Sequence, residues 1–226
     1  MAADEGWEEL RAAGFLHAAR DAHRNATLAV FGALSRDDGF TDRSFGFASF
    51  DVLASQLDRV LRRGLAGPVT RDDLNGSPGW RYGRFRVLLK RHEFGGVRGV
   101  RWDRDSPTKQ AVARQTYRAD PQLALDIGLP DEPDTPGVVT LVLAHSASPE
   151  PLELELFLGL PRLNADGGPA WHWLRRLDDE ALGADPRRKL VESTLPLWTD
   201  GDGEADVPLR LRRPRARNGG PTSETA

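Results

Sequence analysis

The sequence predicts an α+β fold in which two N-terminal helices pack on a mainly antiparallel sheet of about five strands. Three observations support this prediction. Apolar residues recur every three or four positions within residues 1–64, and they alternate with polar residues in several segments of residues 79–178. The connections between those later segments are short, which favours antiparallel pairing because a parallel crossover needs a dozen or more residues.

The length of 226 residues and the apolar content of 39% indicate a chain that buries a core without a disulfide or a metal. We assign residues 1–178 to one domain, helical over 1–64 and forming a sheet over 79–178. Residues 179–213 are expected to form an extension packed on this domain, and residues 214–226 a flexible tail.

The first helix is predicted from Trp7 to about His23, and residues 26–34 either continue it or follow a short break. The second helix has the clearest helical period in the chain. Its apolar positions are Phe47, Phe50, Leu53, Leu57, Val60 and Leu61.

Polar residues near these helices suggest where they begin and end. Ser44 or Ser49 is expected to cap the start of the second helix, and Gly64 its end. Thr70 and Asp73 have the spacing of a capping box, which predicts one further helical turn.

Five segments are predicted as strands: 80–91, 97–103, 138–145, 152–158 and 170–177. Gly95 and Gly96 are expected to form the hairpin turn that joins the first two strands. The continuous apolar run over 138–145 is typical of a central strand buried on both faces. Ser106 followed by Pro107 predicts the start of a short helix.

Charge is sharply segregated along the chain. Residues 79–118 contain eleven Lys or Arg and three acids, whereas residues 119–161 contain eight acids and no Lys or Arg, in a chain of net charge −3. Segments of +8 and −8 must either meet in the fold or face a charged partner. The choice between these two outcomes decides the function that we expect.

Basic and aromatic side chains are concentrated on the first expected hairpin. They are Arg84, Arg86, Lys90, Arg98, Arg101, Trp80 and Trp102. Basic groups with aromatic neighbours on a sheet hold phosphates and stack bases. Our first hypothesis is therefore an accessory or regulatory binding module that contacts nucleic acid or an acidic protein surface. The alternative is that Glu153 and Glu155 neutralise these cations across the sheet.

An enzymatic hypothesis rests on Glu93, Asp103 and Asp105, with Lys109 nearby. A metal-dependent nuclease or phosphoesterase needs such carboxylates around Mg²⁺, but their spacing here matches no known motif. Whether the protein is an enzyme is left open, and the lack of a motif argues against catalysis.

A third hypothesis is an assembly protein whose acidic and basic segments pair between subunits.

The remaining histidine and glycine patterns indicate no metal and no cofactor. The five histidines lack metal-ligand spacing, and the chain has no Gly-x-Gly-x-x-Gly or Walker A motif. His145 and Ser146 end a strand, but adjacent strand residues point to opposite faces and do not form a dyad. Trp171 and Trp173 are expected to share a face that His172 opposes.

Composition also bears on location. The chain has no cysteine, and its acidic start has no apolar segment, so we expect no signal peptide and a cytoplasmic protein without membrane contact.

Arginine outnumbers lysine 28 to 3, which is typical of a GC-rich bacterial genome and weakens any argument from arginine content. Five C-terminal arginines either add phosphate contacts or belong to a solvated tail: Arg210, Arg212, Arg213, Arg215 and Arg217.

Overall fold

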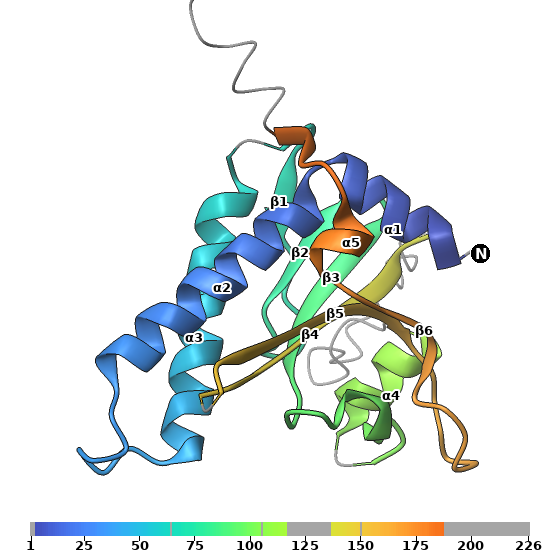
Figure 1. The fold of residues 1–226 in the computed structure, drawn as a ribbon. Coiled ribbons are helices and arrows are strands. Elements are labelled where there is room, and N and C mark those ends of the chain that lie inside the picture. The colour runs from blue at the N-terminus through green and yellow to red at the C-terminus, as the bar shows by residue number, and fades with distance from the viewer. Residues whose placement is uncertain (1–2, 64, 105, 117–136, 150, 188–226) are drawn as a thin grey trace, which may run out of the picture. The chain divides into compact units, whose positions relative to one another are not determined.

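A computed structural model describes residues 3–63, 65–104, 106–116, 137–149 and 151–187, and it confirms the α+β fold class (Figure 1). The five C-terminal arginines, the expected tail and most of the expected extension lie outside the described residues. The first part of that extension contains a short helix, α5 (Asp179–Leu182), whose Leu182 is fully buried in the core.

Residues 3–63 contain three helices rather than two: α1 (Ala3–Ala12), α2 (Phe15–Ala33) and α3 (Asp42–Leu61). The single helix predicted from residue 7 to residue 23 is wrong, because it breaks at Gly14. Gly14 has φ 80°, a left-handed conformation that only glycine adopts without strain. Residues 26–33 continue α2 without a second break.

The expected helix caps need correction. The N-cap of α3 is Thr41, whose Oγ1 accepts a hydrogen bond from the backbone N–H of Ser44 at 3.4 Å, and neither serine proposed from the sequence takes this place. Arg62 is the C-cap, and Gly64 lies outside the described residues. The further helical turn expected at residues 70–73 is instead the edge strand β1 (Val69–Arg71), whose residues pair with the next strand.

Among the described residues, six strands form one sheet in the order β1-β2-β3-β4-β5-β6. The strands after β1 are β2 (Gly79–Tyr82), β3 (Phe85–Arg91), β4 (Val139–Ser148), β5 (Glu153–Pro161) and β6 (Trp171–Arg176). Every neighbouring pair is antiparallel except β3 and β4, which are parallel. The segment predicted as one strand over 80–91 is a β2–β3 hairpin, which turns at Gly83 with φ 53°.

The strand predicted over 97–103 is absent. Residues 97–99 form a short 3₁₀ helix, η1 (Val97–Gly99), and the chain then reaches α4 (Pro107–Arg114), which begins where Ser106 and Pro107 predicted. β3 therefore pairs with β2 and β4, and residues 98 and 101 do not lie on a hairpin partner. β4 is buried on both faces along most of its length, as its apolar sequence predicted.

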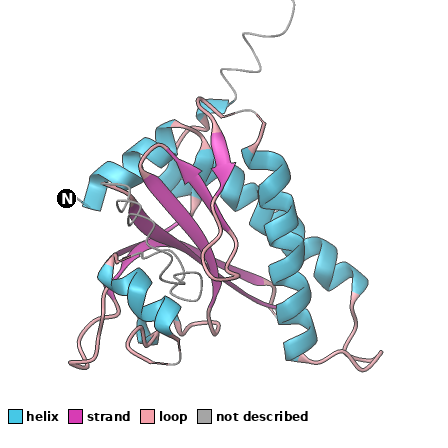
Figure 2. Cartoon of the chain, turned by 180° about the vertical axis from the view of Figure 1, so that it is seen from behind, coloured by secondary structure: helices cyan, strands magenta, loops and turns pink. Residues whose placement is uncertain are grey.

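Helices lie on both sides of the sheet (Figure 2), and apolar side chains form one cluster on each of its faces. On one face, α1, α2 and α3 pack against alternate residues of β3 and β4, such as Phe85 and Leu141. On the other face, α4 and the segment around η1 pack against Leu88 and Val142. Among the described helices, none is both long and apolar enough to cross a membrane.

A register shift in β6 separates two tryptophans that were expected to share a face. Trp171 pairs with Pro161 and Trp173 with Leu160, so His172 is an extra residue in the β6 strand. Trp171 consequently belongs to the cluster under α4, whereas Trp173 packs against the cluster under the long helices.

Candidate functional site

The cations of the β2–β3 hairpin contact carboxylates of the same chain. Arg84 forms an ion pair with Glu5 of α1. The side chain of Arg86 is 12% exposed, and its Nε lies 2.9 Å from an oxygen of Asp72, which also pairs with Arg81 at 2.6 Å. Burial alone would raise the pKa of Asp72, but the hydrogen bonds from the two arginines outweigh it and lower the pKa below its ordinary value.

The acids expected to neutralise the hairpin lie elsewhere. Glu153 is exposed, and Glu155 accepts a hydrogen bond from the backbone N–H of Gly95 at 2.9 Å and lies 3.7 Å from His92. Neutralisation of the hairpin is thus local, by α1 and the β1–β2 connection. Neutralisation of these cations by carboxylates was the alternative expected from the sequence. The acids expected to do so were Glu153 and Glu155, whereas Glu5 and Asp72 contact the arginines.

The other expected binding residues are also mostly engaged or buried. Lys90 donates to the Oγ of Ser77, and burial together with nearby Lys109 lowers its pKa. Arg98 is exposed on η1. Trp102 is 2% exposed and its ring meets that of Trp171 edge-to-face at 5.2 Å, so it has no open face for stacking a base.

Two of the three carboxylates of the enzymatic hypothesis, Glu93 and Asp103, lie among the described residues, and they are not gathered into one site. Arg101 donates two hydrogen bonds of 2.8 Å to Asp103 and lowers the pKa of that carboxyl. Glu93 lines a pocket to which Asp103 does not contribute, and Asp105 lies outside the described residues. Within the described ranges, no group of three or more His, Asp or Glu side chains is arranged to hold a metal ion.

A pocket of about 750 Å³ opens between the α2–α3 helix pair and the C-terminal ends of β3 and β4. Because β3 and β4 are parallel, their C-terminal ends meet at one edge of the sheet. His92 directly follows β3, His145 lies near the end of β4, and His23 reaches the same place from α2.

These three histidines are almost completely buried, with exposures of 3% for His23, 7% for His92 and 2% for His145. The Nε2 atom of each has no hydrogen-bond partner within the described protein. The rings of His23 and His145 meet edge-to-face at 5.7 Å, and Phe50 stacks on His145 at 5.9 Å. Buried polar atoms without partners cost stability and mark places where a ligand or water is to be expected.

Burial keeps the histidines neutral near pH 7. Desolvation, reinforced by repulsion from His92, lowers the pKa of His23 to about 4. Desolvation also lowers the pKa of His145 well below its ordinary value, with added repulsion from the other two histidines and Arg91. For His92, desolvation lowers the pKa against the opposing effects of its hydrogen bond to a backbone carbonyl and of Glu155.

The protonation of His92 can be assigned further. Its Nδ1 lies 2.8 Å from the carbonyl oxygen of Glu93, which can only accept, so Nδ1 carries the proton in the neutral ring. Nε2 is then an acceptor. The backbone N–H of His92 donates to the carbonyl of His145 at 3.1 Å, which ties the two pocket strands together at this edge.

Arg91, the last residue of β3, brings a positive charge to the pocket. Its guanidinium lies against the backbone of Gly46 in α3, where a Cβ would overlap it. No carboxylate of the described residues forms an ion pair with Arg91, whereas Arg36 and Asp42 at the same pocket pair with each other at 2.5 Å. The sequence patterns did not single out Arg91 or His23, because only the parallel β3–β4 pairing and the helix packing bring them together.

Comparisons of the chain with protein-family models, curated proteins and solved structures find no match.

Proposed function

We propose that the protein binds a small ligand that carries an anionic group in the pocket between α2, α3 and the ends of β3 and β4. One observation carries this proposal: the Arg91 guanidinium shares the pocket with three buried histidines whose Nε2 atoms have no partner in the described protein. An anion would pair with Arg91 and accept a hydrogen bond from Nε2 of His23 or His145 when that nitrogen carries the ring proton, whereas Nε2 of His92 is an acceptor and would face a donor group of the ligand.

The size and composition of the pocket support a small ligand. Its volume of about 750 Å³ lies within the usual range for small-molecule sites. Ser49 and Ser146 add hydroxyl groups to the lining, and Phe45 adds an apolar wall. Sites of this kind combine mostly apolar walls with a few polar groups that orient the ligand.

The proposal is tested by calorimetric titration with inorganic phosphate and a series of small carboxylates, comparing the natural protein with Arg91→Gln. Loss of one charged hydrogen-bonding partner is expected to weaken binding by about tenfold or more. Arg114→Gln, at the exposed end of α4, is the matched control and should bind as the natural protein does. Absence of binding by every anion, or equal binding by Arg91→Gln, would contradict the proposal.

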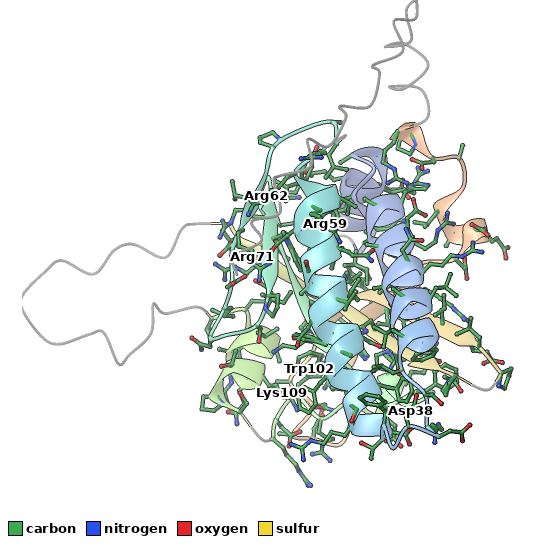
Figure 3. All side chains as sticks on the ribbon, turned by 90° about the vertical axis from the view of Figure 1, so that its left-hand side faces the viewer. Asp38, Arg59, Arg62, Arg71, Trp102 and Lys109 are labelled. Carbon is green, nitrogen blue, oxygen red and sulfur yellow. The ribbon has the colours of Figure 1, made fainter. Side chains whose placement is uncertain are left out.

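A second candidate function is contact with nucleic acid or an acidic protein surface through arginines at the C-terminal end of α3. Arg59, Arg62 and Arg63 are exposed, and none forms an ion pair with a carboxylate of the described residues. Figure 3 shows Arg59 and Arg62 beside Arg71 at this end of the helix. The corresponding hypothesis for the β2–β3 hairpin stays a prediction, and its Arg84 and Arg86 already contact acids of the same chain.

Fluorescence anisotropy with a labelled oligonucleotide tests this second candidate. Binding should fall steeply with salt, and the triple change Arg59→Ala, Arg62→Ala and Arg63→Ala should reduce it and flatten the salt dependence. Binding that is independent of salt, or unaffected by the triple change, would exclude this surface.

Three further predictions from the sequence remain open. The phosphoesterase and assembly hypotheses stay predictions, because no observation on the described residues favours either. The cytoplasm remains the proposed location, on the ground that a chain of 226 residues contains no cysteine.

A further inference from the structure

We infer that the ligand of this pocket is an organic acid with one carboxylate and an aromatic body, and not a phosphate dianion. The inference rests on the proposed function and narrows its ligand class. Two features of the pocket carry it: the balance of charges in its lining, and the aromatic side chains beside them.

The charged residues that line the pocket are two cations and two anions: Arg36, Arg91, Asp42 and Glu93. Arg36 and Asp42 neutralise each other through their ion pair, Arg91 and Glu93 are both exposed, and Arg91 forms no ion pair with a carboxylate of the described residues. Arg91 therefore supplies one positive charge for a ligand. A monoanion matches that charge, whereas a dianion would bring a second negative charge to neutral imidazoles and Glu93, with no further unpaired cation in the described lining.

The histidines supply hydrogen bonds without adding charge. Near pH 7 they are neutral, so each ring has one N–H donor and one acceptor nitrogen. A carboxylate has two oxygens, so it can pair with Arg91 and still accept from a ring N–H. The second negative charge of a phosphate dianion would need a second positive charge in the pocket. A buried histidine could supply that charge only by taking up a proton, which its burial opposes.

Aromatic side chains form the apolar part of the lining. Phe31 and Phe45 meet edge-to-face with ring centroids 5.4 Å apart, and Phe94 lies in the lining with 37% of its surface exposed. Phe94 and Arg91 both line the pocket, so a ligand whose anion pairs with Arg91 has an exposed ring in the same cavity. Rings prefer stacked or edge-to-face contacts with other rings, which favours an aromatic body.

The experiment measures calorimetric affinities of benzoate, phenylacetate and indole-3-acetate, each against its neutral amide, together with acetate and inorganic phosphate. At least one aromatic acid is expected to bind about tenfold or more tightly than its amide, acetate and phosphate. Phe94→Ala should weaken that acid by about fivefold, as expected for a lost ring contact. Phe47→Ala removes an exposed phenylalanine that is not part of the lining, and it should leave the affinity unchanged.

The outcomes separate the two proposals. If phosphate or acetate binds at Arg91 as tightly as the best aromatic acid, the ligand class is wrong and the anion-binding function stands. If Phe94→Ala and Phe47→Ala have equal effects, the aromatic contact is wrong. If no anion binds, both the ligand class and the proposed function fail.

Discussion

The β2–β3 hairpin and the pocket at the ends of β3 and β4 share a strand but differ in how their polar groups are satisfied. The hairpin has the denser positive charge, and its Arg84 and Arg86 contact Glu5 and Asp72 of the same chain. The pocket has one unpaired arginine and three histidines whose Nε2 atoms lack partners among the described residues. Charge density along a sequence is therefore a poor guide to the groups that remain available for a ligand.

The reason lies in what surrounds each region. The hairpin borders α1 and the β1–β2 connection, both of which carry acids that can reach an arginine. The pocket histidines are enclosed by apolar groups such as Phe50, which stacks on His145 and offers no hydrogen bond. A polar group in such surroundings stays unsatisfied until a ligand or water reaches it.

The largest expected effect is a loss of stability in acid that originates in the pocket. His23 has a pKa of about 4 in the folded protein and 6.5 when unfolded, so the unfolded state binds more protons between these values. The free energy of unfolding should fall by about 3 kcal/mol from this residue as the pH drops through that window, and His145 adds to the loss. Urea unfolding at a series of pH values measures it.

The control for this prediction is a histidine outside the pocket. His23→Gln should flatten the dependence of unfolding free energy on pH, whereas His172→Gln, at an exposed position of β6, should leave it unchanged. Equal slopes for His23→Gln and the natural protein would mean that the histidine is not buried in its neutral form.

A smaller effect is expected from removing the acids of the hairpin region. Asp72→Ala removes a carboxylate that contacts both the mostly buried Arg86 and Arg81, and it should lower the free energy of unfolding by about 2–3 kcal/mol. Glu5→Ala removes the partner of the exposed Arg84 and should cost less than about 1 kcal/mol. Urea unfolding compares the two, and a Glu5→Ala effect as large as that of Asp72→Ala would contradict the assignment of burial.

A comparably small effect on stability is expected at Gly46, where stability and binding should change in opposite directions. Gly46 lies inside α3, and alanine there should raise helix stability by up to about 1 kcal/mol. Its Cβ would displace the Arg91 guanidinium, the end of a flexible side chain, so ligand affinity should fall by about tenfold. Gly32→Ala in α2, where a Cβ meets no atom, should leave the affinity unchanged.

Thermal unfolding and calorimetry of the two glycine variants measure these changes. If Gly46→Ala binds the ligand as tightly as the natural protein, Gly46 does not position Arg91. If it unfolds at a markedly lower temperature, the space beside Gly46 is filled by more than a movable side chain.

Several elements were predictable because they depend on local pattern. The apolar run of β4, the alternation in β5 and the serine–proline start of α4 each correspond to the element expected there. The errors occur where local patterns compete. A single glycine broke the first helix, a glycine turn divided the strand over 80–91 into two, and one extra residue in β6 separated Trp171 from Trp173.

The amino-acid order was sufficient for the α+β class and for the burial of β4, because hydrophobic period and run length act within a few neighbouring residues. The pocket required the tertiary structure. Arg91, His145 and His23 are far apart in sequence, and they meet only because β3 pairs with β4 in parallel and α2 covers the strand ends. Such pairing is decided by the packing of the whole domain, which no local pattern encodes.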